Sequence, residues 1–315
     1  PFFDLNNKIQ IHYLSLNSSA NIYLSYISNT FKIRKILKRE QIDFVIDVCT
    51  AMSLMSVPAT IFTKTKVISW EHFNAYVNWN PITSPLARKL ASLFAYKIVV
   101  LTETDKKIFQ TKYKAKNVTV IPNPITINLS TPSSLQKKII LSIGRLEYQK
   151  GFDMLIEAWD KSKAKENGWQ LKIIGEGSLR NELLNLINNK QLQRSIIIEE
   201  PSHNVIELYQ NASIFILSSR FEGLPLVLIE AISMGLPIIS FDCETGPRDI
   251  VYDNINGRLI TPNDIEALSV AIDELTSDLT LLNQYSINSL RISKNFDKST
   301  IVQLWKKILK ENPSL

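Results

Sequence analysis

Short apolar runs alternate with longer stretches of helical periodicity along most of this 315-residue chain. In the first part, apolar runs predict strands at 9–14, 43–48, 66–70, 97–101 and 118–121, and the segments between them predict helices at 22–39, 84–95 and 102–113. Strands that are apolar nearly throughout and alternate with helices indicate a parallel sheet covered on both faces. Residues 122–137 carry three prolines and no long apolar run, which predicts a linker.

A second alternation of the same kind fills the rest of the chain. Strands are predicted at 139–144, 170–174, 195–199, 213–217 and 237–241, and helices at 152–164, 178–190, 203–210, 225–234, 263–275, 279–290 and 298–310. The economical architecture is α/β, with two doubly wound Rossmann-like domains that face a cleft. We place the first domain at 1–130, the second at 131–297 and a C-terminal helical segment at 298–315.

Composition narrows the class of protein. The hydrophobic share of 45% suffices for two packed cores, and no run of 18 apolar residues predicts a membrane-spanning helix. Cys49 and Cys243 are far apart in sequence, which favours free thiols and a cytoplasmic protein. There is no Cys/His cluster with metal spacing and no Asp-x-Asp, so we expect neither a metal nor a cofactor.

Positive charge is concentrated in the first part of the chain. Residues 1–130 hold 16 Lys and Arg against 7 Asp and Glu, whereas the remainder is slightly acidic. This balance fits an anionic partner such as a membrane surface or a lipid diphosphate, or a solvated basic surface without a partner. Nucleic acid is disfavoured because the basic residues are not interleaved with aromatic ones. The basic segment 31–39 fits a membrane-bound helix, but its apolar spacing favours a helix that covers a sheet.

A glycine-framed loop follows the predicted strand 139–144. It runs from Gly144 to Gly151 and carries Arg145 and Lys150 at the carboxyl end of the strand, where doubly wound sheets bind ligands. A guanidinium and an ammonium group together match a diphosphate. Two unrelated surface cations are the alternative interpretation.

A second segment, 220–231, enters an apolar helix with carboxylates at Glu222 and Glu230. Gly223 lets the backbone approach a ligand, and Pro225 suits the first helical position. The free N–H groups and the positive end of the helix dipole attract an anion, while the carboxylates can accept hydrogen bonds from hydroxyls. The combination suggests a sugar nucleotide. We expect Glu230 about two turns inside the helix.

Two further positions follow predicted strands. Gly175, in Gly175-Glu176-Gly177, fits either a tight strand-to-helix turn or close contact with a ligand. His72 follows the strand 66–70, where a histidine can donate to a sugar hydroxyl or move a proton, although a lone histidine is more often structural.

These residues together resemble the retaining glycosyltransferases of family 4, which have the GT-B fold. The resemblance rests on Gly144-Arg145-Leu146 through Lys150-Gly151, on Ile174 through Gly177, on Ser218 through Pro225 and Glu230-Ala231, and on the segments 234–239 and 256–260. Trp70-Glu71-His72-Phe73-Asn74 is similar to bacterial capsule, lipopolysaccharide and lipid-linked-oligosaccharide enzymes that transfer galactose or N-acetylgalactosamine.

The resemblance implies a role for each residue. Arg145 and Lys150 would bind the donor diphosphate, and Glu230 would hold the nucleotide ribose. Glu222 and the backbone of Gly223, Leu224 and Pro225 would hold the donor sugar and phosphate, with Gly144 and Gly175 beside them. His72 would lie near the sugar and the acceptor, and the last helix would cross back to the first domain. Such enzymes need no metal.

The implied function is transfer of a hexose or N-acetylhexosamine from a nucleotide sugar, UDP-linked, to a lipid-linked glycan at the cytoplasmic face of the membrane. Retention would follow either from a double displacement through Glu222 or from attack on the same face, which we favour. A nucleotide-sugar epimerase of the same fold and a non-catalytic binding fragment are the alternatives. The family begins with a strand, a Gly-rich loop and a helix that do not precede residue 9, so we expect a chain truncated at its N-terminus.

Overall fold

The computed structural model describes residues 8–14, 22–78, 80–127, 131–202 and 204–310. The chain folds as two compact units: the first holds residues up to 99 together with 108–119, and the second holds 100–107 and everything from 120 onward. The predicted ends of the domains, at 130 and 315, and the start of the predicted helix 203–210 lie outside the described residues. The helix expected to cross back between domains stays a prediction.

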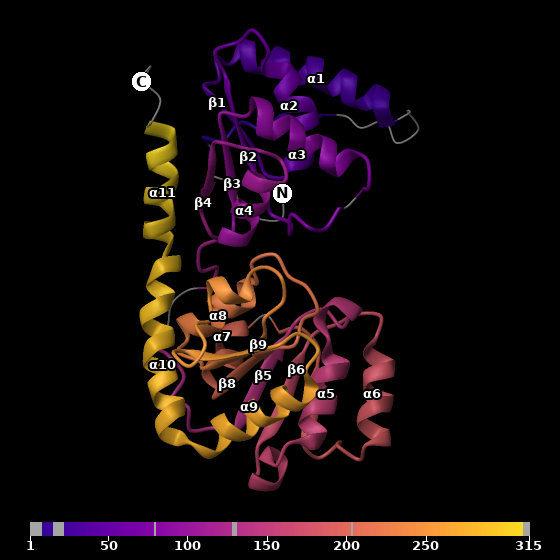
Figure 1. The fold of residues 1–315 in the computed structure, drawn as a ribbon, viewed down its shortest axis with the longest axis vertical. Helices are drawn as coiled ribbons and strands as arrows, with labels where there is room; N and C mark the ends of the chain where they lie inside the picture. Colours follow the sequence, from indigo (N-terminus) through magenta and orange to yellow (C-terminus); the bar gives the residue numbers. More distant parts are fainter. Residues whose placement is uncertain (1–7, 15–21, 79, 128–130, 203, 311–315) are drawn as a thin grey trace. The chain divides into compact units, whose positions relative to one another are not determined.

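A four-stranded sheet with the order β1-β2-β3-β4 organises the first unit (Figure 1). Strands β1 to β3 pair in parallel, with Val45 opposite Val67 and Ser69 opposite Ile98. The elements are α1 (Ile22–Arg39), β1 (Phe44–Asp47), α2 (Ser53–Thr60), β2 (Lys66–Trp70), α3 (Thr83–Phe94), β3 (Lys97–Val100), α4 (Glu103–Thr111) and β4 (Val118–Val120).

Helix α1 packs against α2, with Leu37 buried and Ile33 and Ile36 half-buried, so the apolar residues of this basic segment face inward as predicted, although their main neighbour is a helix and not the sheet. Among the helices that the structure describes, none is both long and apolar enough to cross a bilayer.

The strand predicted at 9–14 is wrong. These residues have no regular secondary structure and join no ladder of the described sheet, and Ile9, Ile11 and Tyr13 are exposed. Alternation of apolar and polar side chains favours a strand only where a neighbouring strand supplies backbone partners. Conversely, helix α2 forms where the sequence pattern predicted no helix.

The second unit is built on a six-stranded sheet with the order β10-β9-β8-β5-β6-β7 (Figure 1), in which every neighbouring pair is parallel. Its strands are β5 (Ile139–Ile143), β6 (Gln170–Ile174), β7 (Ile196–Glu199), β8 (Ile214–Leu217), β9 (Ile238–Phe241) and β10 (Gly257–Ile260). Its helices are α5 (Phe152–Lys161), α6 (Arg180–Asn189), α7 (Val205–Gln210), α8 (Leu226–Ser233), α9 (Ile265–Ser277), α10 (Leu279–Ser293) and α11 (Lys298–Lys310). Strands β5, β6 and β7 follow one another toward one side of the sheet, and β8, β9 and β10 follow one another toward the other side. Strands β5 and β8 therefore flank a topological switch point.

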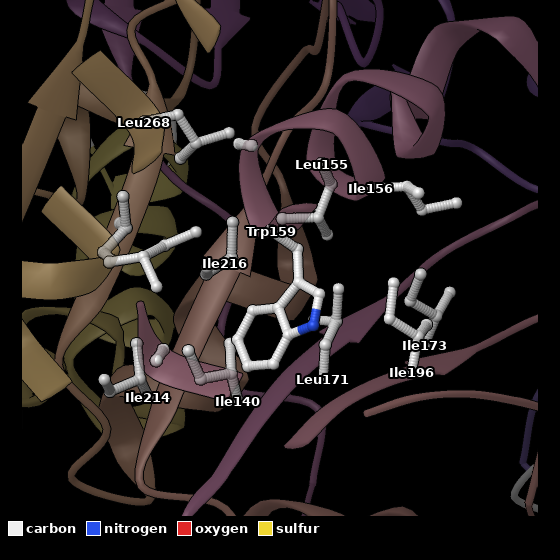
Figure 2. Close-up of a cluster of buried hydrophobic side chains, with 14 of the residues drawn as sticks. Ile140, Leu155, Ile156, Trp159, Leu171, Ile173, Ile196, Ile214, Ile216 and Leu268 are labelled. Atoms are coloured by element: carbon white, nitrogen blue, oxygen red, sulfur yellow. The ribbon is translucent and has the colours of Figure 1, made fainter. Parts of the chain in front are cut away.

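Trp159 of α5 lies at the centre of the second unit's core (Figure 2). It is fully buried against the sheet, and its indole N–H donates to Ser195 Oγ at 3.1 Å, so the large ring is buried without an unsatisfied polar atom. The surrounding side chains are Ile140, Leu155, Leu171, Ile196, Ile214, Ile216 and Leu268, drawn in Figure 2. This core fixes the strands whose carboxyl ends carry the candidate site.

Candidate active site

The candidate site lies where the loops after β5 and β8 leave the sheet. Strands β5 and β8 are hydrogen-bonded neighbours, with Ile140 opposite Ile214 and Leu141 opposite Phe215. Parallel neighbours direct their carboxyl ends to the same edge, and connections that leave in opposite directions open a crevice there. The glycine-framed loop and the segment before α8 therefore come together, although they are far apart in sequence.

The loop after β5 is shaped by a turn that only glycine can complete. Residues Tyr148–Lys150 form a short 3-10 helix, and Gly151 follows with φ of +63° before α5 begins. A Cβ on Gly151 would lie 2.2 Å from the carbonyl oxygen of Ser218, in the loop after β8. The glycine thus allows both the left-handed backbone and the close approach of the two loops.

The loop after β8 enters α8 slightly differently from the prediction. Pro225 has ψ of 106° and is the N-cap, so Leu226 is the first helical residue. Glu230 is the fifth residue of α8, and because four residues span about one turn, it lies about one turn inside the helix and not two as expected. The first N–H groups of α8 have no intrahelical acceptor and point out of the helix start.

Polar contacts join the loop after β5 to the loop after β8. Arg220 donates to both carboxylate oxygens of Asp153, at 2.9 and 2.5 Å, and its guanidinium lies 4.1 Å from the centre of the Tyr148 ring. The backbone carbonyl of Gln149 accepts a hydrogen bond from the backbone N–H of Arg220 at 2.8 Å. The side-chain amide of Gln149 donates to the carbonyl of Phe221 at 3.0 Å. A bidentate pair with a stacked ring fixes the geometry more firmly than a single ion pair.

Lys150 and Glu222 meet at the centre of this junction. Lys150 Nζ lies 2.7 Å from Glu222 Oε1, and the two side chains are only 14% and 7% exposed. Arg145 lies on the same loop, is exposed, and donates to the Gln149 side chain at 3.0 Å. Gly144 packs under the alkyl chain of Lys150. The structure therefore brings together the two cations and the first carboxylate that the sequence singled out.

Glu230 is held by two hydroxyl groups. Its Oε2 accepts from Tyr209 at 2.8 Å, and its Oε1 accepts from Thr126. Burial, followed by the Glu230 charge, raises the pKa of Tyr209 well above its ordinary value, so this phenol remains a hydrogen-bond donor at neutral pH. A carboxylate has about four acceptor positions, which leaves Glu230 able to accept from a ligand hydroxyl as well.

Gly175 has a structural reason to be glycine. A Cβ there would lie 1.9 Å from the Gly144 carbonyl oxygen, because the loops after β5 and β6 pack backbone to backbone. Together with the segment after β7 and helix α7, these two loops line a cavity of about 210 Å³. Its lining is mainly apolar and includes Ile143, Ile174, Pro201, Val205 and Leu208, with Arg145 at its border.

His72 belongs to the first unit. Its ring lies 4.2 Å from that of Trp70, and its buried Nε2 has no hydrogen-bond partner among the described residues. Burial lowers the pKa of His72, so the neutral imidazole is favoured at neutral pH.

The loop that carries His72 is anchored by a fully buried ion pair between Glu71 and Arg88, at 2.8 Å. Arg88 also donates to the carbonyls of Ala75 and Val77, both at 3.0 Å. The contacts of Arg88 thus fix the loop after β2 to helix α3.

Several partners of these residues could not be predicted from the sequence. Tyr209, Thr126 and Asp153 carry no local motif, and they join the site only through tertiary contacts. The nearest available signal was the general rule that a buried tyrosine hydroxyl needs a partner. Within the described residues, no group of three or more His, Cys, Asp and Glu side chains is placed to hold a metal ion.

Two family models match the chain. Residues 127–291, just over half of it, match the model described as glycosyl transferases group 1, and residues 4–129 match that of glycosyltransferase family 4. The chain therefore belongs to the group 1 glycosyl transferases, and the expectation of a glycosyltransferase with a family 4 resemblance is confirmed.

Several bacterial glycosyltransferases are similar to this chain over most of its length. An uncharacterized glycosyltransferase of Haemophilus influenzae is 35% identical over 98% of this chain and 88% of its own length. The amylovoran biosynthesis glycosyltransferase AmsD of Erwinia amylovora is 29% identical over 98% of this chain and 87% of its own. A Campylobacter jejuni α-1,4-N-acetyl-D-galactosaminyltransferase, whose name gives a diphosphoundecaprenol-linked glycan, is 28% identical over 98% of this chain and 87% of its own.

Solved structures establish the fold. The crystal structure of Anabaena HepE in complex with UDP superposes with a TM-score of 0.82 at 18% identity, covering 92% of this chain and 84% of that one. At this identity the likeness concerns the fold alone, and it confirms the expected GT-B architecture of Rossmann-like units.

Proposed function

We propose that this chain transfers a hexose or N-acetylhexosamine, with retention and without a metal ion, from a UDP-linked sugar to a lipid-linked glycan in bacterial surface polysaccharide synthesis. The observation that carries the proposal is the convergence of Arg145 and Lys150 with the start of α8 at the switch point between β5 and β8. The names of the Erwinia and Campylobacter relatives support the pathway class and the lipid-linked acceptor. The UDP complex of HepE supports the nucleotide.

The diphosphate would lie between the two cations and the free N–H groups of α8. Breaking the bond between the anomeric carbon and the phosphate oxygen leaves negative charge on the diphosphate and positive charge on the sugar. Fixed cations and backbone donors stabilise the first of these without reorganising. Arg145 and Lys150 would supply the positive charge that a metal ion provides in other transferases, which supports metal independence.

The remaining contacts suit the rest of the donor. The largely apolar cavity beside Gly175 would take the flat nucleobase, with Arg145 between it and the diphosphate. Glu230 would accept from the ribose hydroxyls, and Glu222 with the backbone of Gly223, Leu224 and Pro225 would hold the sugar and its phosphate. His72 would donate to the sugar or the acceptor.

The pairing of Glu222 with Lys150 supports attack on the same face. A carboxylate that is 7% exposed and ion-paired at 2.7 Å is poorly placed as a nucleophile for a double displacement. In the same-face route the acceptor hydroxyl bonds to the anomeric carbon while the departing phosphate oxygen takes its proton, which balances the charges without a protein base.

The test is a mass-spectrometric screen of nucleotide sugars against lipid-diphosphate glycans with the full chain. For the active pair, we expect Arg145→Ala and Lys150→Ala each to lower the rate roughly 100-fold, as loss of one preorganised donor does. Lys163→Ala, an exposed lysine of the second unit, is the matched control and should leave the rate unchanged. Full transfer by both site variants would contradict the proposed diphosphate site.

Two further measurements test metal independence and the retention of anomeric configuration. Chelation by EDTA should leave the rate unchanged, and the anomeric configuration of the product, read by NMR, should equal that of the donor. An inverted product, or a free epimerised nucleotide sugar without consumption of acceptor, would contradict the assigned reaction.

A further inference from the structure

The amino ends of the first unit's strands form one edge of its sheet, and this edge is basic. Strands β1 to β3 are parallel, so the segments that precede them meet at the same edge. The segment before β4 joins them there, because the N–H of Ile98 donates to the carbonyl of Asn117 at 2.8 Å. We call these segments, 38–43, 61–66, 94–97 and 112–117, the basic edge.

Lysines dominate the charges of the basic edge. The exposed ones are Lys38, Lys64, Lys112, Lys114 and Lys116, and Lys66 and Lys97 lie over the Tyr96 ring at 4.4 and 6.0 Å. Asp43 is exposed on the same edge, and Glu40 pairs with Arg39 at 2.6 Å. Asp47 is buried at the end of β1, and Glu71, which follows β2, is buried in its ion pair with Arg88, so neither acid offsets the lysines of the basic edge.

Apolar side chains protrude between these lysines. Phe62 is 97% exposed and Ile61 is 50% exposed, at the tip of the connection between α2 and β2. Phe94, at the end of α3, is 65% exposed. Ile61 and Phe94 also border a groove of about 460 Å³ whose lining includes Leu90 and Lys66. The exposed apolar side chains and the lysines therefore share the basic edge.

Hydrogen bonds anchor the backbone on both sides of Phe62. Thr63 donates twice to the Thr60 carbonyl, from its N–H at 3.0 Å and from its hydroxyl at 2.7 Å. Thr65 donates to the Ile42 carbonyl at 2.8 Å, and Arg34 donates to the Ile61 carbonyl at 2.6 Å. Phe62 itself has φ of +58°, a backbone region that a bulky residue rarely adopts. A left-handed residue also follows α1, α4 and α6, at Gln41, Lys114 and Gln191, but Phe62 is the one that places an aromatic side chain there.

We propose that the basic edge docks on an anionic lipid bilayer, with Phe62 and Ile61 entering the interfacial layer and the lysines facing lipid phosphates. Lysines near an anionic bilayer gain affinity one by one, and aromatic rings favour the boundary between headgroups and hydrocarbon. Nucleic acid is negatively charged like the anionic bilayer. However, Phe62 and Ile61 protrude from one tip and do not form a row of platforms on which bases stack. The docking is independent of the donor site, because none of its residues belongs to that site.

The test is flotation of the full-length protein with vesicles of phosphatidylcholine, with or without phosphatidylglycerol. We expect binding only to vesicles that contain phosphatidylglycerol, weakened by salt. Lys64→Gln with Lys116→Gln should lower the partition coefficient roughly fivefold for each lysine removed. Phe62→Ser should lower it roughly tenfold, which corresponds to partial transfer of the ring from water.

Matched controls come from the second unit. Lys163→Gln with Arg194→Gln removes two exposed cations, and Ile287→Ser removes an aliphatic side chain that is 68% exposed, so both should bind vesicles as the unchanged protein does. Phe62→Asn serves as a second variant that tolerates the positive φ, so that a loss of binding does not reflect misfolding.

Several outcomes overturn the proposal. Equal binding to both kinds of vesicle, or unchanged binding by the Phe62 and lysine variants, contradicts it. Binding to single-stranded RNA without binding to vesicles would assign the edge to nucleic acid. A dimer that Phe62→Ser converts to a monomer would assign it to a second copy of the chain.

Discussion

Removing both partners of the Lys150–Glu222 ion pair should cost less stability than the sum of the two losses measured when each partner is removed alone. We consider Lys150→Met and Glu222→Gln, which keep the approximate size of each side chain and remove its charge, alone and together. At 2.7 Å and an effective dielectric constant of about 20, the attraction is on the order of 6 kcal/mol. The cost of removing both ions from water offsets part of it.

We therefore expect each single variant to lose about 2–4 kcal/mol, because it leaves one poorly solvated charge without its partner. The double variant should lose less than the sum of the two by about 2–3 kcal/mol, since neither charge remains. Urea denaturation monitored by tryptophan fluorescence measures the three free energies of unfolding, and calorimetry with UDP reports donor binding separately. Lys150→Met should weaken UDP binding about tenfold or more, whether or not Glu222 is also changed.

Losses that add within about 0.5 kcal/mol would refute the reasoning. They would mean that Lys150 and Glu222 are each solvated independently in the folded protein. The Lys161–Glu266 pair is the matched control, because both side chains are substantially exposed, at 44% and 72%. Its coupling should be below about 1 kcal/mol.

Three further predictions concern other parts of the two units. Burial raises the pKa of Asp47 to about 6, so the folded protein binds an extra proton between about pH 4 and 6 and loses stability as the pH rises through that range. Asp47→Asn should remove this loss, and its free energy of unfolding should exceed that of the unchanged protein by roughly 2 kcal/mol at pH 7.5 and match it at pH 4, by urea titration. Gly175→Ala should abolish UDP binding or prevent folding, because its Cβ would lie 1.9 Å from a carbonyl oxygen, whereas Gly168→Ala, at φ of +79° with open space around it, should cost only about 1 kcal/mol. Tyr209→Phe removes a donor to Glu230 and should raise the donor KM about five- to tenfold with little change in kcat, and equal kinetics with the unchanged protein would show that the hydroxyl does not position the carboxylate.

The sequence predicted the parts of the site that follow from local rules. Strand ends, glycines and a proline before an apolar helix led to Arg145, Lys150 and Glu222, because the carboxyl ends of parallel strands share an edge. The order of the strands then brought these residues together across 72 positions of sequence.

Other features depend on contacts that no local pattern encodes. Tyr209 reaches Glu230, and Arg220 reaches Asp153, only because the sheet orders their elements side by side. Helix α2 was missed because it contains Pro58 and several serines and threonines, and its packing against α1 outweighs its weak intrinsic propensity. For the segment 9–14 the error is the opposite one: a strand was predicted where none forms, since alternation alone does not supply a ladder partner.

The adjacency of β5 and β8 also governs when the site comes into being during synthesis. A ribosome that has released the chain only as far as α6 has already made Arg145 and Lys150, but their counterpart at Glu222 does not yet exist. At the proposed donor site, UDP would therefore bind only those chains whose later strands have docked beside the earlier ones, and it would stabilise them by mass action. Nucleotide in the cell would then favour completed molecules and would not stabilise partial ones.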